Sequence, residues 1–342
     1  MILVRSRAWW LNKVPLSVIL MLALLDGRTL SLGALAVLTM VVLTVCSVGN
    51  YGYAVNDLFD TEEDARTGRV NAATDVGRRR VWGIVGASAL CAEVFAAVVA
   101  GAPGAILTLL ALCLPLAYSA PPLRLKERKW LGVCADGLAA HVYPALLALL
   151  AVGHWTLRPV TTALAVCVMV WSAAGGLRGI LSHQLFRADR DRTAGLRTVV
   201  HDFGNVPVEK FIVGAVLPLE AAAFGGVLVL CDTGLIAWLF VALYLIYELF
   251  KTVSGVFRVT AFRPQGQRYL PFVDESLYKA WGPLVLALDA ARADLAYLLV
   301  IPVYGLLFAP HLRGELQRLR SGMVELTINR ATEPGVRSNA ES

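Results

Sequence analysis

The sequence predicts an all-α membrane protein, and three observations lead to that prediction. Of the 342 residues, 57% are hydrophobic and 16% are charged, and the mean hydropathy is +0.64. This composition is typical of polytopic membrane proteins and excludes a soluble globule. The apolar residues fall in long runs, and arginine and lysine gather in the connections between the runs.

Nine apolar runs are long enough for membrane helices, because a hydrocarbon core about 30 Å thick needs about 20 residues. They span residues 8–25, 30–55, 81–100, 103–119, 131–152, 158–182, 208–230, 234–256 and 280–309. The last run is the longest and contains Asp289, Arg292 and Asp294. These residues either pair at i, i+3 or mark a break between two shorter helices.

The basic residues indicate how the chain is oriented. If the N-terminus lies inside, the connections after the second, fourth, sixth and eighth runs carry most of the loop arginine and lysine. The positive-inside rule then places these connections on the cytoplasmic side of the plasma membrane. A ninth crossing would leave the basic tail with Arg313 outside, against the rule. The net charge of +6 therefore reflects orientation and does not indicate a nucleic-acid partner.

Residues 1–322 are expected to form one membrane domain, and residues 323–342 a disordered tail. The first run is interpreted as a retained helix, because Lys13 interrupts it and no small-residue cleavage site follows. The six cysteines are dispersed without a CxxC pair, so neither a disulfide framework nor a zinc site is predicted.

The stretch N-D-L-F-D-T-E-E-D interrupts the apolar sequence at the end of the second run. If the helix continues through it, Asn56, Asp60 and Asp64 share one face and Asp57 falls beside them. Like charges at i, i+4 repel unless a cation takes up the charge. Oxygen-only ligands favour Mg²⁺, which completes its shell with water and substrate phosphates. The alternative is a solvated acidic helix end.

Two further cytoplasmic connections carry groups that suit a diphosphate. After the fourth run, two prolines stop the helix that ends at Tyr118, and Arg124 and Lys126 follow as diphosphate ligands or as positive-inside anchors. The connection after the sixth run carries Arg187, Asp189, Asp191 and Arg197. Such carboxylates and cations could hold a diphosphate through bridging metal ions and direct contacts.

Ionisable residues also occur inside the apolar runs, where they usually face a cavity or a partner. They include Glu93, Asp136, Glu220 and Glu248. Asp136, with His141 and Tyr143 following, is the better candidate for a cavity wall. His183 and Gln184 could orient an acceptor near the cavity mouth or make a packing hydrogen bond.

The three ordered motifs resemble those of the UbiA superfamily of intramembrane prenyltransferases. The family's N-D-x-x-D-x-x-x-D motif is matched in full by Asn56, Asp57, Asp60 and Asp64. The segment from Tyr118 to Lys126 is similar to the family's YSxPPxRxK. The third motif, D-x-x-x-D-x-x-x-G-x-K/R-S/T, is matched by Asp191, Gly195, Arg197 and Thr198.

Two positions depart from the family pattern. Arg187 stands where the third motif usually has its first Asp, and Asn71-Ala72-Ala73 stands where Asn-Arg-Pro is common. The first change is compatible with a weak second metal site, with Asp189 as a substitute ligand, with a direct contact between Arg187 and diphosphate, or with lost or altered activity.

The resemblance implies a bundle of about nine transmembrane helices around a central cavity, capped by cytoplasmic loops. It also implies Mg²⁺-dependent ionisation of a polyprenyl diphosphate and transfer of the prenyl group to an aromatic or other lipid-soluble acceptor. Carried over residue by residue, the implied catalytic residues are Asp60, Asp64 and Asp191. The implied metal ligands are Asn56, Asp57, Asp60, Asp64, Asp189 and Asp191. The implied diphosphate ligands are Asn56, Arg69, Tyr118, Arg124, Lys126, Arg187 and Arg197.

Two other functions are compatible with the sequence. A terpene cyclase of the same fold would ionise the same substrate and let its own double bonds attack the cation, so that no acceptor is needed. A lipid carrier or scaffold would use the membrane bundle without catalysis.

Overall fold

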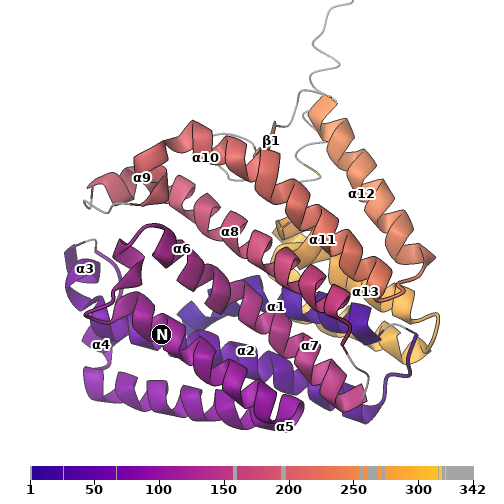
Figure 1. Ribbon diagram of the computed structural model, residues 1–342, viewed down its shortest axis with the longest axis horizontal. Coiled ribbons are helices and arrows are strands. Elements are labelled where there is room, and N and C mark those ends of the chain that lie inside the picture. The colour runs from indigo at the N-terminus through magenta and orange to yellow at the C-terminus, as the bar shows by residue number, and fades with distance from the viewer. Residues whose placement is uncertain are drawn as a thin grey trace, which may run out of the picture.

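The computed structural model describes residues 2–25, 27–66, 68–156, 160–193, 198–253, 258–260, 269–271, 274–314, 316–317 and 320. The described chain is almost entirely helical (Figure 1). Its helices are α1 (Ile2–Leu25), α2 (Leu32–Phe59), α3 (Thr61–Arg66), α4 (Ala72–Asp75), α5 (Arg78–Ser119), α6 (Trp130–Gly137), α7 (Tyr143–Thr156), α8 (Thr162–Thr193), α9 (Val199–Phe203), α10 (Asn205–Phe211), α11 (Leu217–Leu230), α12 (Leu235–Val253), α13 (Gly282–Ala290) and α14 (Val300–Leu307).

Shorter 3₁₀- or π-helical turns extend several of these helices. They are η1 (Leu125–Glu127), η2 (Leu138–Val142), η3 (Ile212–Val216), η4 (Asp274–Trp281) and η5 (Leu295–Leu299). Two three-residue strands, β1 (Arg258–Thr260) and β2 (Tyr269–Pro271), pair in parallel. The expected tail, residues 323–342, lies outside the described residues.

Within the described residues, five helical segments are long and apolar enough to cross a membrane. They are Leu32–Phe59, Arg78–Ser119, Trp130–Thr156, Thr162–Asp189 and Asn205–Leu230. Many large apolar side chains on the outer faces are exposed, including Leu90, Leu109 and Leu243. A lipid-facing surface needs such side chains, because hydrocarbon cannot solvate polar groups. The prediction of an all-helical, multi-pass membrane protein is confirmed.

Helix α5 is a hairpin of two helices. Gly101, at φ 61° and ψ −154°, interrupts its 42 residues, which as one straight helix would be roughly 60 Å long. Both ends of α5 return to the same end of α2: Arg78 donates to the Leu58 carbonyl at 3.0 Å, and Ser119 donates to Asn56. The separate runs 81–100 and 103–119 therefore correspond to its two halves.

The last apolar run is also a hairpin and not one long helix. A turn between Ala291 and Asp294 separates α13 from η5 and α14, and the Tyr304 hydroxyl donates to the Lys279 carbonyl at 2.8 Å. Residues after α14 consequently return to the face where η4 begins. This placement removes the conflict between the basic tail and the positive-inside rule.

The two acidic side chains at the turn of this hairpin accept hydrogen bonds from the backbone of other segments. Asp289 accepts hydrogen bonds from the backbone N–H groups of Gly234, at 2.6 Å, and Ile236, at 3.2 Å. Asp294 caps η5 and accepts from the Leu30 N–H at 2.9 Å. Asp289 thus satisfies backbone N–H groups at the start of α12, and Asp294 links the start of η5 to the connection before α2.

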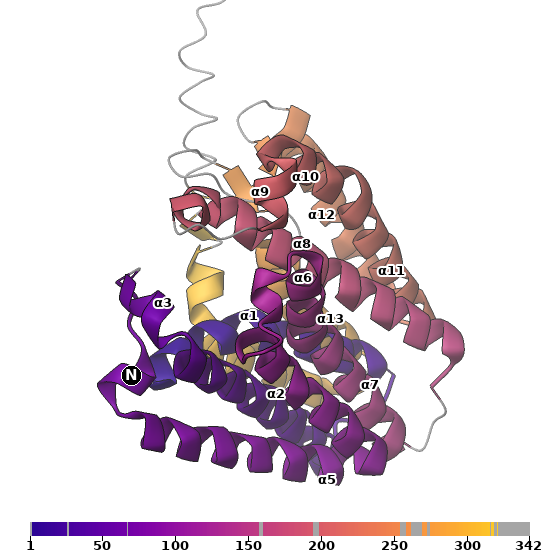
Figure 2. The same ribbon diagram turned by 60° about the vertical axis from the view of Figure 1, so that its left-hand side comes forward.

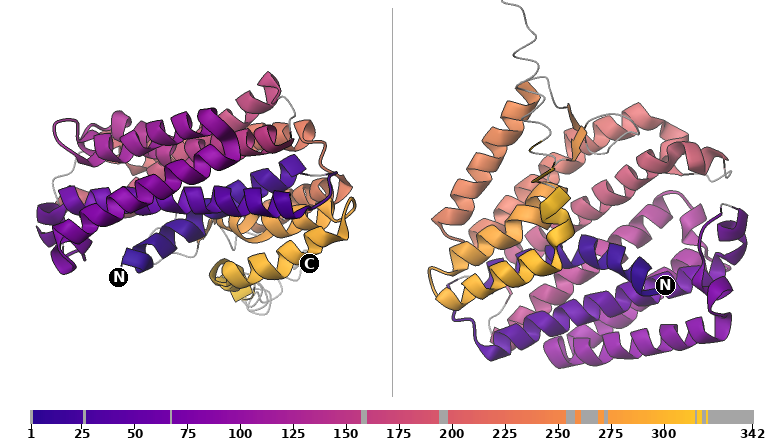
Figure 3. Two further views of the ribbon diagram at one scale, coloured as in Figure 1. Left: turned by 90° about the horizontal axis from the view of Figure 1, so that it is seen from below. Right: turned by 180° about the vertical axis from the view of Figure 1, so that it is seen from behind.

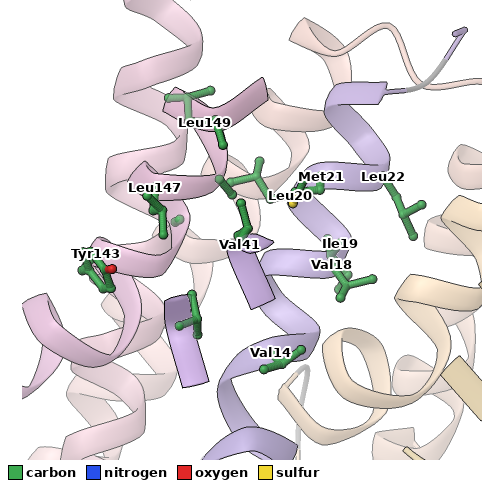
Figure 4. Packing of buried hydrophobic residues seen from close by; sticks show 14 of the residues in the cluster. Val14, Val18, Ile19, Leu20, Met21, Leu22, Val41, Tyr143, Leu147 and Leu149 are labelled. Atoms are coloured by element: carbon green, nitrogen blue, oxygen red, sulfur yellow. The ribbon is translucent and has the colours of Figure 1, made fainter. Parts of the chain in front are cut away.

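Helix α1 lies in the centre of the bundle and packs against α2, α7 and α13. Its side chains, including Val14, Ile19 and Met21, are almost completely buried in the main hydrophobic core (Figure 4). Seen from behind, the hairpin of α13 and α14 lies beside α1 (Figure 3). The short helices α3, α4 and α9 gather at one end of the bundle, the left end in Figure 1. Figure 2 shows α3 and α9 again on a common side.

Candidate active site

A cavity of about 770 Å³ lies at the end of the bundle that carries α3 and α9. Nine of the twelve predicted site residues line it: Asn56, Asp57, Asp60, Asp64, Arg69, Tyr118, Lys126, Arg187 and Asp191. They come from the ends of α2, α5 and α8 and from the connections between helices. The fold therefore brings the three sequence motifs to one space, which we call the polar cavity.

The acidic stretch does not form one continuous helix, which was the condition for Asn56, Asp60 and Asp64 to share one helix face. Helix α2 ends at Phe59, Asp60 has φ −105° and ψ 13°, and α3 begins at Thr61. The first turn of α3 contains Glu62, Glu63 and Asp64, where carboxylates interact favourably with the positive end of the helix dipole. Asp60 and Asp64 nevertheless stay one turn apart, because the Asp64 N–H donates to the Asp60 carbonyl at 2.8 Å.

Asn56 and Asp57 connect the end of α2 to its neighbours. The Asn56 side-chain oxygen accepts a hydrogen bond from Ser119 at the end of α5. Asp57 is 3% exposed, and its Oδ2 accepts from the Ala72 N–H at 3.0 Å, at the start of α4. Asp57 therefore has a structural contact in addition to its place in the cavity wall.

Asp64 is held in a buried polar contact. Its Oδ2 accepts from Asn71 Nδ2 at 2.8 Å, and its Oδ1 lies 3.7 Å from Arg69 Nη1. The Asn71 Oδ1 in turn accepts from the backbone N–H groups of Ala73 and Thr74 and caps α4. Asn71 thus orients both the carboxylate and the short helix beside it.

Lys126 reaches across the cavity from η1 to the acidic stretch. Its Nζ lies 2.7 Å from Asp60 Oδ1 and 2.5 Å from Glu63 Oε2. Glu63 was not among the predicted site residues, although it stands only three positions after Asp60. That spacing was the signal available in the sequence, because residues three apart share a helix face.

Asp191, in the last turn of α8, provides the second acidic position. It is 8% exposed, and its Oδ1 lies 3.7 Å from Arg187 Nε, one turn earlier. Burial raises the pKa of Asp191 above its ordinary value, although Arg187 and Arg69 act in the opposite direction. Burial likewise raises the pKa of Asp60, against the stabilising effect of Lys126 on its charged form.

Three predicted residues are not placed in the polar cavity. Arg124 does not line it; its guanidinium pairs with Glu127 at 2.7 Å and lies 3.8 Å from Glu63. Asp189 is exposed on α8 and does not line the cavity either. Arg197 lies outside the described residues.

The charges around the polar cavity favour a cation. Seven acidic side chains and three basic ones line it: Asp57, Asp60, Glu63, Asp64, Glu127, Asp136 and Asp191 against Arg69, Lys126 and Arg187. Among the described residues, no three acidic, histidine or cysteine side chains converge to form a metal site by themselves. The donors present suit a hard cation held by one or two carboxylates, with its remaining ligands from water and from a bound anion.

A second, smaller cavity of about 140 Å³ adjoins the first. Apolar residues such as Val48, Leu114 and Ala139 form much of its wall. It shares four lining residues with the polar cavity: Tyr53, Asn56, Tyr118 and Asp136. We call this space the apolar chamber. Together the two spaces suit a molecule with an anionic head and a hydrocarbon tail. The expectation that Asp136 forms part of a cavity wall is confirmed.

Solved structures with the same fold come from UbiA homologues. A homologue from Archaeoglobus fulgidus, bound to DMAPP and Mg²⁺, is 21% identical, with a TM-score of 0.56 over 87% of this chain and 98% of that one. The apo homologue from Aeropyrum pernix K1 is 15% identical, with a TM-score of 0.54 over 90% of this chain and 98% of that one. A digeranylgeranylglyceryl phosphate synthase is 11% identical, with a TM-score of 0.52 over 92% of this chain and the whole of the other.

Sequence comparison with curated proteins finds no match. The model of the UbiA prenyltransferase family, in contrast, matches residues 14–263, which include all three motifs and both cavities. The chain belongs to the UbiA prenyltransferase family.

Proposed function

We propose that the protein binds a polyprenyl diphosphate together with Mg²⁺, ionises it, and transfers the prenyl group to a lipid-soluble acceptor within the membrane. The observation that carries this proposal is the junction of the acidic polar cavity with the apolar chamber. An isoprenoid diphosphate has the matching division between a charged head and an apolar chain.

The polar cavity has the groups that a magnesium diphosphate requires. Asp60 and Asp64 on one side and Asp191 on the other would hold Mg²⁺ through single carboxylates, and Arg69, Lys126 and Arg187 would contact the diphosphate oxygens. When bound, Mg²⁺ supplies positive charge that stabilises the leaving diphosphate. The Mg²⁺-bound structure of the Archaeoglobus homologue supports this assignment.

The apolar chamber would hold the prenyl chain and keep water from the cation. Tyr53 and Tyr118 lie at its junction with the polar cavity, beside the bond that breaks. Aromatic faces stabilise nearby cations by about 0.5–2 kcal/mol. The chain's own contribution is therefore to hold the two ends of the substrate in different environments and to exclude water from the reacting carbon.

We also propose that the polar cavity faces the cytoplasm across the plasma membrane. The connections beside it are the basic ones, and the C-terminal hairpin brings His311, two residues before Arg313, to the Leu11 carbonyl, at the end of α1 from which Lys13 attracts Asp136. Both placements agree with the positive-inside rule.

Product analysis with geranyl diphosphate tests the proposal. The purified protein is incubated with Mg²⁺ and geranyl diphosphate, with and without a panel of lipophilic phenols and alcohols, and diphosphate release and products are measured. We expect Mg²⁺-dependent release and a prenylated acceptor. Asp60→Asn and Asp191→Asn should each slow release by about 100-fold or more, because a lost electrostatic contact to developing charge commonly costs that much.

A matched control is Asp75→Asn, which changes an exposed carboxylate on α4 that does not line the cavity and should leave release unchanged. Cyclic products without an acceptor would show a cyclase in place of a transferase. No Mg²⁺-dependent release from any prenyl diphosphate would show that the protein is not catalytic.

A further inference from the structure

We propose that Asp136 is the catalytic base that takes up the proton lost when the allylic cation is consumed. This assignment rests on the proposed prenyl-diphosphate chemistry and adds a residue outside the three motifs. It applies whether the cation is captured by an acceptor or by the substrate's own double bonds.

Asp136 lies where the polar cavity meets the apolar chamber. Asp136 lies on α6, near the start of the chain's fifth apolar run, and lines both the polar cavity and the apolar chamber. Among the described residues it is the only acidic side chain that borders both spaces. The other acids line only the polar cavity, where the diphosphate would bind. Asp136 is thus the carboxylate beside the carbon skeleton.

The carboxylate oxygens of Asp136 are also available for a substrate contact. Its carboxylate makes no hydrogen bond or ion pair at contact distance with the residues that the structure describes, and its attractive charged neighbour is Lys13 on α1. Two other acids inside the bundle are occupied: Glu220 receives two hydrogen bonds from Arg178, and Asp289 caps α12. A carboxylate inside a membrane bundle is costly and is usually retained for a ligand or proton pathway. Asp136 therefore has oxygens available to a substrate.

Burial disfavours the charged form of Asp136, and Lys13 is the neighbour that acts in the opposite direction. Its ammonium lies close enough to attract Asp136 and is also 2.6 Å from His141 Nε2. A nearby positive charge favours the ionised acid, which is the form that can accept a proton. Lys13 thus acts as a positioning residue for Asp136.

The reaction balances with Asp136 as the acceptor of the proton. The allylic C–O bond breaks, and both electrons leave with the diphosphate. The acceptor atom, or an internal double bond, forms the new bond to carbon. One proton then leaves that acceptor atom or a carbon next to the cyclised cation and passes to the Asp136 carboxylate. The carboxylates of the polar cavity are poorly suited to this step, because a carboxylate that holds a metal must be deprotonated.

The test uses Asp136→Asn in the full-length protein with Mg²⁺ and geranyl diphosphate. It is run with the acceptor that the wild type uses, or without acceptor if the wild type cyclises the substrate. Diphosphate release should stay close to that of the wild type. The prenylated or cyclised product should fall by about 100-fold or more, the usual contribution of a general base, and an open-chain alcohol formed with water should replace it. Asp136→Glu should restore part of the product.

Glu93→Gln is the matched control. Glu93 is another acid within an apolar helix, one of its oxygens lacks a hydrogen-bond partner, and it lines neither cavity. Its substitution should change neither release nor product. Normal product from Asp136→Asn would overturn the assignment, as would equal loss of release and product, which would place Asp136 in substrate binding or ionisation. A wild type that releases no diphosphate would overturn the proposed function itself.

Discussion

The buried ion pair between Arg178 and Glu220 offers a quantitative test of how this bundle is held together. Arg178 on α8 donates from Nε to Glu220 Oε2 at 2.6 Å and from Nη2 to Oε1 at 2.9 Å. Their side chains are 6% and 0% exposed. The substitution Glu220→Gln keeps the shape of the side chain but removes the negative charge that pairs with the guanidinium.

The magnitude follows from this geometry. Two unit charges about 3 Å apart attract by roughly 5–6 kcal/mol at an effective dielectric constant of about 20. Much of this attraction offsets the cost of removing both charges from water, so the intact pair contributes little net stability. Removal of one partner leaves the desolvation cost of the other, and a loss of about 3–5 kcal/mol is expected. Replacement of both, as in Arg178→Met with Glu220→Leu, should recover most of that loss.

Unfolding in mixed detergent micelles, followed by circular dichroism, measures these free energies. A double-mutant cycle over the two positions isolates their coupling. Glu93→Gln provides the control, because it removes a carboxylate that pairs with no basic side chain among the described residues. A loss below about 1 kcal/mol for Glu220→Gln, within the range of an ordinary substitution, would refute the reasoning. So would a double variant whose loss equals the sum of the single losses.

Three further predictions concern the polar cavity and the helix packing. Asn71→Ala should lower stability by about 1–2 kcal/mol, because it removes the cap of α4. It should also weaken binding of Mg²⁺ with geranyl diphosphate, because Asp64 loses the hydrogen bond from Asn71; calorimetry measures both, and unchanged binding would contradict the second part. Burial holds the pKa of Asp191 above its ordinary value, so Mg²⁺ affinity should begin to fall at a higher pH on acidification than for an exposed aspartate. Titrations from neutral to acidic buffer check this, and Asp191→Asn should weaken the dependence while the part due to Asp60 remains. Gly176→Ala should destabilise the bundle, because the new Cβ would lie 3.0–3.2 Å from neighbouring backbone and side-chain atoms. At Gly225 a new Cβ would meet no atom of a neighbouring element within 4 Å, so Gly225→Ala should stabilise α11 by about 0.5–1 kcal/mol. Equal midpoints of thermal unfolding for the two variants would argue against this packing account.

The acidic stretch shows where inference from sequence succeeds and where it stops. Its residue types indicated a cation-binding role, and the fold does bring Asp60, Asp64 and Asp191 to one cavity. The condition of a continuous helix is not met, because α2 ends at Phe59 and α3 begins at Thr61. Local spacing cannot reveal such a break when a residue from a distant segment, here Lys126, pairs with the side chain at the break, here Asp60.

The sequence also could not predict which charged residues pair with each other. Glu63 meets Lys126 although the two are 63 residues apart, and Arg124 pairs with acids and does not line the polar cavity. Both cations belong to the same motif, so their different surroundings depend on the backbone path after α5. Arg124 itself adopts a left-handed conformation, with φ 37°.

The sequence by itself determined the membrane architecture, the family and most of the residues that line the polar cavity. Long apolar runs can be satisfied only as packed helices in lipid, and the order of the motifs is a property of the chain. Only the tertiary structure decided that α5 and the last run fold back as hairpins, and that Asp136 stands between the two cavities. The physical reason is that turns, close helix approaches and charge partners arise from contacts between segments far apart in the chain, which hydropathy and spacing do not encode.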